Sequence, residues 1–270
     1  MRYRGPLKAV ILDWAGTTVD YGCVAPVVVL KEIFKANGVH LTDQQARRDM
    51  GLLKKDHIRA VTEIPRVAHD WAERFGKRPT EPDVDRLFAS FIPLQLDCLA
   101  RYSAVIPGVP EAVTRFRERG LKIGSTTGYT RPMLDIVIRG AARYGYSPDA
   151  SVTPDEAPAG RPAPWMCYRN AILLEVYPLE ACVKIGDTSV DIAEGLNAGM
   201  WTIGVIEGGN EIGLSQAEWE ALAPAERESL AERARQRLME AGAHESVSSL
   251  SACDAALDRL EAMLRAGERP

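Results

Sequence analysis

Four short apolar runs, separated by helical segments, constrain the fold of this 270-residue chain most strongly. They cover residues 7–13, 121–126, 182–187 and 201–206. Runs that are apolar on both faces are typical of strands in a parallel sheet, because helices cover both faces of such a sheet. Helical segments long enough for the crossovers lie at residues 132–144, 164–176 and 190–198. The sequence therefore predicts an α/β fold with a doubly wound parallel sheet.

The first strand is followed by a long stretch with helical patterns only. Pro26 begins one predicted helix, and Thr42 with Gln45 forms a capping box for the next. Because the sheet resumes only after this stretch, we expect an inserted helical domain. The predicted domains are a catalytic core of residues 1–21 and 104–270 and a helical insertion of residues 22–103.

Composition and charge exclude several functional classes. The chain has 33 Lys and Arg against 37 Asp and Glu, a net charge of -4, and no basic stripe, so we expect no nucleic-acid partner. No apolar run reaches the about 18 residues of a membrane helix, and the N-terminal segment becomes acidic too early for a signal peptide. The five widely spaced cysteines form no CxxC pair and predict reduced thiols. We expect a cytoplasmic protein with a small-molecule partner and no membrane contact.

Polar residues follow three of the predicted strands. Asp13, the pair Thr126-Thr127 and Asp187 stand at or just beyond strand ends, and Asp191 follows at the start of a helix. A single aspartate there is more often a helix cap than a catalyst, but three converging strand ends favour a ligand site at this edge of the sheet. Two close carboxylates favour a divalent cation, and hard oxygen ligands favour Mg²⁺.

Four motifs resemble, in order, those of the haloacid dehalogenase superfamily. They are DWAGTTVD at residues 13–20, Thr127-Gly128, Gly160-Arg161-Pro162 and GDTSVD at residues 186–191. The resemblance implies a Rossmann-like core, a cap domain formed by the insertion, and Asp13 as a nucleophile toward phosphorus. Superfamily phosphatases carry a second carboxylate two residues after the nucleophile, where this chain has Ala15. An ordinary phosphatase would lose its general acid by that change.

Lys54 is the candidate that compensates for the missing acid. If the chain is helical from Gly51, an angle of about 100° per residue places Lys54 and His57 on an apolar face. That face holds Leu53, Lys54, His57, Ile58, Val61 and Ile64, and the opposite face holds Lys55, Asp56, Arg59, Thr62 and Glu63. Desolvation would lower the pKa of Lys54 and make its amine nucleophilic. A lysine that extends from an apolar stripe to solvent is the alternative, and His57 is either a proton shuttle or an ordinary cap residue.

An amine opposite an aspartate nucleophile suggests cleavage of a carbon–phosphorus bond. An imine formed from a neighbouring aldehyde accepts the electrons of that bond, and no alcohol has to be protonated. The segments DWAGTTVDYGC, MGLLK, TTGYT and AGRPAPWM closely resemble the phosphonoacetaldehyde hydrolase (phosphonatase) family. The resemblance implies hydrolysis of phosphonoacetaldehyde to acetaldehyde and phosphate, through a Lys54 Schiff base and an Asp13 aspartyl-phosphate, in the degradation of 2-aminoethylphosphonate.

The resemblance also implies roles for other residues. Mg²⁺ would be bound by the carboxylates of Asp13 and Asp187 and the carbonyl of Ala15, with Asp191 supporting this shell. The residues implied to contact the phosphonate or the cap side of the substrate are Thr127, Gly128, Arg161, Tyr129, Met50, Cys23 and His57. The family implies a homodimer formed through the cap, to which the apolar residues 27–30 would contribute.

Two alternative functions remain at this stage. One is another phosphatase of the same superfamily acting on a small phosphate ester, although Ala15 argues against it. The other is an inactive sensor of a phosphorylated metabolite. Asp13, Arg161 and Asp187 are all retained, which argues against a sensor, because a sensor needs no nucleophile.

Overall fold

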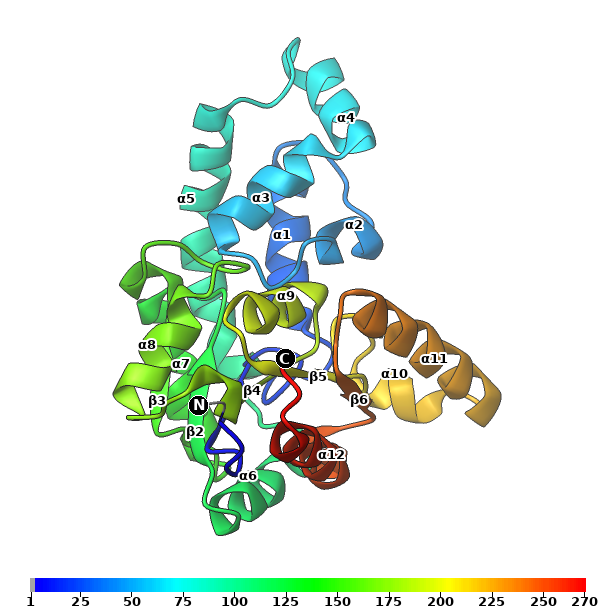
Figure 1. Cartoon of the computed structure of the whole chain (residues 1–270). Helices are drawn as coiled ribbons and strands as arrows, with labels where there is room; N and C mark the ends of the chain where they lie inside the picture. The colour runs from blue at the N-terminus through cyan, green and yellow to red at the C-terminus, as the bar shows by residue number, and fades with distance from the viewer. Residues whose placement is uncertain (1–2) are drawn as a thin grey trace.

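A six-stranded parallel sheet forms the centre of the computed structural model, which describes residues 3–270 (Figure 1). The strands are β1 (Ala9–Leu12), β2 (Lys122–Thr126), β3 (Ala150–Val152), β4 (Cys182–Gly186), β5 (Trp201–Val205) and β6 (Glu245–Val247). Their order is β3-β2-β1-β4-β5-β6, and every neighbouring pair is parallel. The predicted doubly wound sheet is confirmed. Ligands bind to such sheets where the strand order reverses, which here is between β1 and β4.

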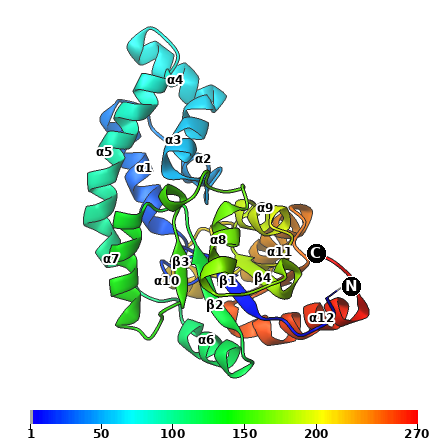
Figure 2. The same ribbon diagram turned by 60° about the vertical axis from the view of Figure 1, so that its left-hand side comes forward.

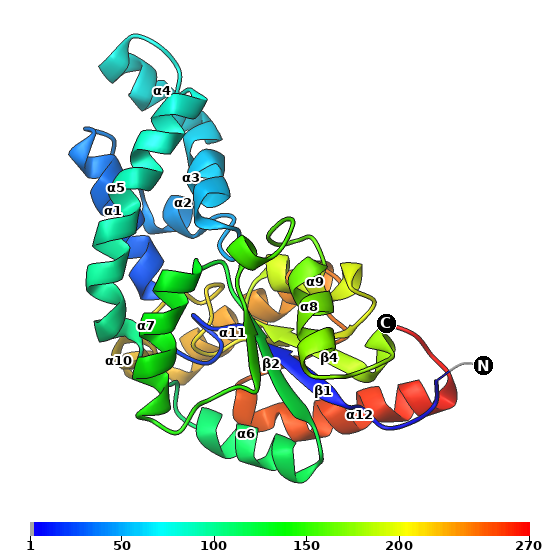
Figure 3. The same ribbon diagram turned by 90° about the vertical axis from the view of Figure 1, so that its left-hand side faces the viewer.

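The helices cover both faces of this sheet (Figure 3). One face packs against α6 (Val109–Glu118), α7 (Arg131–Ala142) and α12 (Cys253–Ala266), and the other against α8 (Trp165–Leu173), α9 (Ser189–Asn197) and α11 (Pro224–Glu240). Side chains of β1 alternate between the two: Val10 and Leu12 belong to the first core, and Ala9 and Ile11 to the second. All four are fully buried, as expected for a central parallel strand.

Two edge strands differ from the prediction. The strands β3 and β6 are not among the four strands predicted from the apolar runs. Each edge strand has only three residues, too few for an apolar period to show. The charged segment between β5 and β6 contains two helices, α10 (Gln216–Ala221) and α11. Pro224 separates them, because proline has no backbone N–H and is suited to the first turn of a new helix.

Residues 24–102 form a helical unit that contains no strand. It consists of α1 (Val24–Ala36), α2 (Asp43–Arg47), α3 (Lys54–Glu63), α4 (Pro65–Phe75), α5 (Glu81–Leu99) and η1 (Ala100–Tyr102). The unit lies beyond the sheet, above the loops that follow β1 and β4 (Figure 2). The predicted capping box at the start of α2 is confirmed, with Thr42 and Gln45 bonded reciprocally. Within residues 3–270, no helix is both long enough and apolar enough to cross a membrane.

Candidate active site

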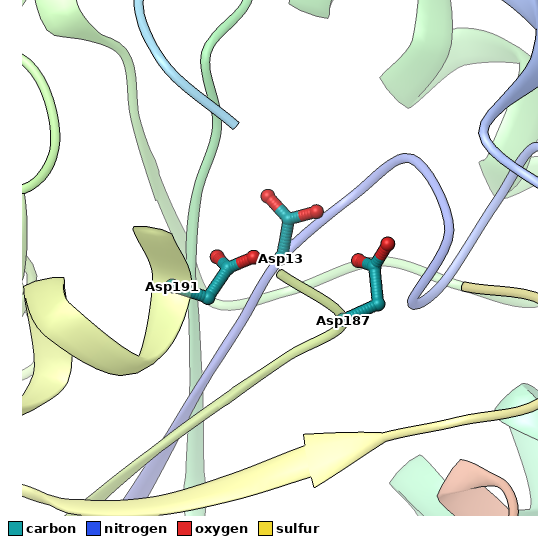
Figure 4. Close-up of side chains that lie close together, drawn as sticks. All are labelled: Asp13, Asp187 and Asp191. Carbon is teal, nitrogen blue, oxygen red and sulfur yellow. The ribbon is translucent and has the colours of Figure 1, made fainter. Parts of the chain in front are cut away.

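Three buried aspartates meet at the carboxyl ends of β1 and β4 (Figure 4). Leu12 pairs with Ile185, so Asp13 and Asp187 leave neighbouring strands at nearly the same level. Asp191 reaches the same point from the first turn of α9. One carboxylate oxygen from each aspartate lies within 4.8 Å of the others. The predicted convergence of these side chains is therefore what the fold produces.

The carboxylate of Asp187 is held through both oxygens. The hydroxyl of Thr17 donates to Oδ1 at 2.6 Å, and the backbone N–H of Asn210 donates to Oδ2 at 2.8 Å. The loop after β1 can approach this closely only with glycine at position 16, because a Cβ there would lie 2.3 Å from Oδ2 and the φ angle is +91°. Burial, followed by the charges of Asp13 and Asp191, raises the pKa of Asp187 well above its usual range.

This cluster has the chemistry of a divalent-cation site. The atoms that could bind a cation here are hard carboxylate oxygens. Burial raises the pKa of Asp13, as it does that of Asp187, because little water is available to stabilise the charge. A bound dication would offset both the desolvation and the mutual repulsion. Ala15, whose carbonyl was the predicted third ligand, lines the cavity beside Asp13. The residues present therefore fit a divalent metal ion.

Arg161 contacts the predicted nucleophile directly. Its Nη2 atom donates to Asp13 Oδ1 at 2.6 Å, and its other contacts are to Asp191, Glu194 and Thr126. The sequence predicted that Arg161 would hold substrate oxygens. The structure shows that the same guanidinium, which is almost fully buried, also fixes one oxygen of Asp13. A planar guanidinium offers five N–H donors, so it can donate to Asp13 and also to substrate oxygens.

Lys54 points from the helical unit toward these carboxylates. It is the first residue of α3, only 4% exposed, with Nζ 3.8 Å from Met50 Sδ and 5.4 Å from the centre of the Tyr129 ring. Burial lowers the pKa of Lys54, although the charge of Asp13 acts in the opposite direction. Lys55 is instead paired with Asp85 at 2.5 Å. As the sequence predicted, Lys54 is therefore buried, whereas Lys55 is paired with a carboxylate.

Two details of this helix differ from the prediction. The helix begins at Lys54, not at Gly51, whose φ angle of +95° is not helical. Thr62 was expected on the polar face but is buried, and its hydroxyl is satisfied by donating to the carbonyl of Arg59 at 2.6 Å. An i−3 backbone bond of this kind lets a threonine lie on an apolar face.

A small cavity lies where the helical unit meets the core. Its lining consists of Asp13, Ala15, Cys23, Met50, Gly51, Lys54, Thr127, Gly128, Tyr129, Arg161 and Thr188. Nine of these eleven residues were predicted site residues; Gly51 and Thr188 were not. Its volume of about 20 Å³ accommodates roughly one water molecule. In this structure the cavity is therefore too small for a larger ligand.

Among the predicted residues, Cys23 and Tyr129 line this cavity, whereas His57 does not. His57 is fully buried in α3, and burial lowers its pKa to about 3, so the ring is neutral. Burial raises the pKa of the Cys23 thiol and of the Tyr129 hydroxyl well above their usual ranges, so both are protonated. The Tyr129 hydroxyl has no hydrogen-bond partner in the described part of the chain.

Arg47 connects the helical unit to the core. From the end of α2 it donates to the carbonyl of Gly22 at 2.7 Å and to that of Gly213, in the loop after β5, at 2.8 Å. The side chain of Asn210 in that loop donates back to the carbonyl of Arg47 at 3.3 Å. Because the N–H of Asn210 also holds Asp187, the position of the helical unit is coupled to the aspartate cluster.

Sequence reasoning missed two charged residues behind Arg161, Lys184 and Glu194. Both are fully buried, and together with Thr126, which was predicted at a strand end, they contact one another or Arg161. The signal that could have found Lys184 is a lone charge within the apolar run CVKIGD. Such a charge is expected to have partners, because an unpaired buried ion is very costly.

The sequence of this chain is similar to those of known proteins. Residues 7–199 match the family model of haloacid dehalogenase-like hydrolases. A phosphonoacetaldehyde hydrolase of Bacillus cereus is 53% identical over 255 residues, covering 94% of this chain and 97% of that protein. One from Bacillus anthracis is 52% identical with the same coverage. The chain belongs to the phosphonoacetaldehyde hydrolase family.

Solved structures agree with this membership. A phosphonoacetaldehyde hydrolase-like protein from Oleispira antarctica superposes with a TM-score of 0.98 at 39% identity, covering 100% of this chain and 98% of that one. A putative beta-phosphoglucomutase from Bacteroides vulgatus has a TM-score of 0.67 at 18% identity over 96% of this chain, and shows the shared fold alone. The family predicted from the sequence motifs is confirmed, and the protein is a hydrolase of the phosphonoacetaldehyde hydrolase family.

Proposed function

We propose that this hydrolase cleaves the carbon–phosphorus bond of phosphonoacetaldehyde, giving acetaldehyde and phosphate in the degradation of 2-aminoethylphosphonate. The observation that carries the proposal is the shared cavity of Lys54 and Asp13. An amine with a lowered pKa and a carboxylate meet there, and position 15 provides no carboxyl acid. This combination serves a substrate with an aldehyde next to a phosphonate.

Lys54 carries out the first step. Its neutral Nζ attacks the aldehyde carbon, and loss of water gives an iminium (Schiff base) ion. Burial favours the neutral amine that this attack requires, and the position of Lys54 at a helix N-terminus further disfavours the ammonium. Met50, Tyr129 and Cys23 would enclose the carbon chain of the substrate. His57, one helical turn away and neutral, would relay protons to and from the nitrogen.

Asp13 carries out the second step. One of its oxygens forms a bond to phosphorus, the carbon–phosphorus bond breaks, and its electron pair moves into the iminium to form an enamine. No alkoxide leaves, so no general acid is needed at Ala15. A water molecule then hydrolyses the aspartyl-phosphate to release phosphate. The enamine takes up a proton at carbon, and a second water releases acetaldehyde and frees Lys54. One water is consumed overall, because imine formation returns one.

The phosphonate oxygens would be bound by Thr127, Gly128 and Arg161, which share the cavity with Asp13. Asp13, Asp187 and the carbonyl of Ala15 would bind Mg²⁺, with Asp191 behind them. When bound, Mg²⁺ supplies positive charge that offsets the repulsion between a carboxylate nucleophile and an anionic phosphonate. Arg161 would contribute positive charge in the same way, through a permanently charged group.

Residues 22–103 are proposed to be a cap that opens for substrate and closes for reaction. The cavity of about 20 Å³ is too small for the substrate, so the cap would have to move to admit it. We also propose a cytoplasmic homodimer formed through this cap. Of the apolar residues 27–30 of α1, Val27, Val29 and Leu30 are buried in the protomer, which leaves Val28 for such a contact.

Product analysis tests the proposal. With phosphonoacetaldehyde and Mg²⁺, we expect acetaldehyde and phosphate in equal amounts, and no turnover by an Asp13→Ala variant. p-Nitrophenyl phosphate serves as the comparison substrate. The proposal would be contradicted if the protein released phosphate from this ester but no acetaldehyde from phosphonoacetaldehyde. The protein would then be a phosphatase that acts on phosphate esters.

A further inference from the structure

Lys184 and Glu194 are fully buried beside the site, and the steps above give them no task. Lys184 lies in the middle of β4, between Val183 and Ile185. Glu194 comes from α9, which packs on that strand. Desolvation makes a buried ion pair weak evidence of a contribution to stability, since apolar residues of similar volume often serve as well. Their contacts with Arg161, Asp191 and Thr126 point to a role in the site.

The two buried cations share one set of acceptors. Lys184 Nζ lies 2.8 Å from Asp191 Oδ1, 3.3 Å from Glu194 Oε2 and 3.0 Å from the hydroxyl oxygen of Thr126. Arg161 contacts the same three atoms, at 2.9, 2.9 and 2.7 Å respectively. Lys184 is therefore a second cation that binds the same three groups that orient the Arg161 guanidinium.

The charges of these buried groups determine whether Arg161 is available to bind Asp13. Asp191 and Glu194 together carry two negative charges, and Lys184 balances one of them. Arg161 can then be shared between the remaining charge and Asp13, to which it donates at 2.6 Å. If Lys184 were neutral, both inner carboxylates would depend on Arg161 alone and would compete with Asp13 for it.

Two glycines allow α9 to approach β4 at this point. A Cβ on Gly195 would lie 2.7 Å from Lys184 Cβ, and a Cβ on Gly186 would lie 2.3 Å from Asp191 Cγ. Glycine is unfavourable inside a helix, so Gly195 is retained at the expense of helix stability. The close packing that brings both acids to Lys184 is thus a specific feature of the fold.

We propose that Lys184 is a positioning residue: together with Glu194 it holds Arg161 against Asp13, at the place where the phosphoryl group binds. This inference rests on the proposed function, because it takes Arg161 as a ligand of the phosphonate oxygens. Lys184 itself touches neither substrate nor nucleophile in this arrangement. Its effect should therefore be confined to the phosphoryl side of the reaction and spare imine formation at Lys54.

The test measures phosphate binding and imine formation separately. Inorganic phosphate is titrated calorimetrically, with Mg²⁺ present, into the wild-type protein, Lys184→Met, and the double variant Lys184→Met/Glu194→Gln. The double variant removes one charge of each sign and so preserves the charge balance of the core. Lys122→Met, at the exposed start of β2, is the control. Reduction of the acetaldehyde imine on Lys54 by borohydride is the second readout.

We expect Lys184→Met to bind phosphate about tenfold more weakly or worse, as for loss of a charged hydrogen-bond partner. In the double variant one inner carboxylate remains, so Arg161 is again shared between that carboxylate and Asp13, and phosphate affinity should recover at least in part. Imine reduction should stay within about twofold of wild type in every variant. A folded Lys184→Met variant with wild-type phosphate affinity would overturn the inference, and so would a double variant that binds phosphate no better than Lys184→Met. Failure of Lys184→Met to fold would also overturn it, because that result would assign the lysine to stability. A wild-type protein that does not cleave phosphonoacetaldehyde would remove the proposed function as well, whereas wild-type cleavage with unchanged phosphate affinity in Lys184→Met removes only this inference.

Discussion

The side-chain nitrogen of Lys54 lies 5.4 Å from the centre of the Tyr129 ring, so a residue of the helical unit and one from the loop after β2 lie side by side in the lining of the cavity. The ring makes the contact, while the hydroxyl has no partner in the described residues. We predict that Tyr129→Phe retains kcat/KM within about threefold, because the aromatic wall is unchanged. Tyr129→Ala should lower it by about a hundredfold or more through misplacement of Lys54. Steady-state kinetics on both variants checks this, and equal losses would show that the hydroxyl takes part.

Asp20 provides a test of pH-dependent stability. Its carboxylate accepts from the N–H of Ala25 at the start of α1, and burial raises its pKa to about 6. Unfolding returns the pKa to about 3.9, so the folded protein binds the proton more tightly and loses stability as the pH rises from about 4 through 6. Asn tolerates the φ of 54° and still accepts the bond, but it cannot ionise. Asp20→Asn should match the wild type near pH 4 and be more stable above about pH 7, by at most about 3 kcal/mol.

Urea unfolding at several pH values measures this difference. The matched control is Asp97→Asn, the same substitution at an exposed position on α5. A difference for Asp20→Asn that is constant with pH, or that shrinks as the pH rises, would contradict the assignment of a protonated Asp20.

The aspartate cluster predicts a stability that depends on divalent metal. Asp13 and Asp187 repel each other in a buried site, so Mg²⁺ should raise the Tm of the wild-type protein as a ligand that binds the native state alone. Asp187→Asn removes one charge and should abolish most of this increase, together with activity. Differential scanning fluorimetry with Mg²⁺ and with EDTA measures the effect. A wild-type Tm that is unaffected by either addition would count against a metal site at this position.

The lack of a carboxyl group at position 15 can be tested by restoring the general acid that superfamily phosphatases carry there. Ala15→Asp places a carboxyl group in a cavity with space for roughly one water molecule. Because the proposed leaving group is an enamine, the new acid has no proton to deliver to it. We expect kcat on phosphonoacetaldehyde to stay the same or to fall. A clear increase would mean that a leaving group is protonated in the normal reaction.

Much of this site was predictable because its residues follow long strands. The apolar runs of β1, β2, β4 and β5 are long enough to identify, and the residues at their ends were placed in one crevice correctly. The short strands β3 and β6 carry no periodic signal and are defined only by pairing with the sheet.

The contacts behind Arg161 could not be predicted in the same way. Lys184, Glu194 and Thr126 come from β4, α9 and β2, and only the tertiary packing shows that one guanidinium joins them. His57 shows the limit of helix periodicity. The period placed it correctly on the buried face of α3, but it could not show that the ring lies outside the cavity wall.

The most direct test of the account is to identify the amine that forms the imine. The protein is incubated with phosphonoacetaldehyde or acetaldehyde, reduced with borohydride, and analysed by peptide mass. We predict one reduced two-carbon adduct, on Lys54, with loss of activity; Lys54→Arg should be inactive and unlabelled, and Lys55→Arg should be labelled and active. An adduct on Lys55, or an active Lys54→Arg variant, would contradict the assignment of Lys54 as the amine that makes carbon–phosphorus cleavage possible.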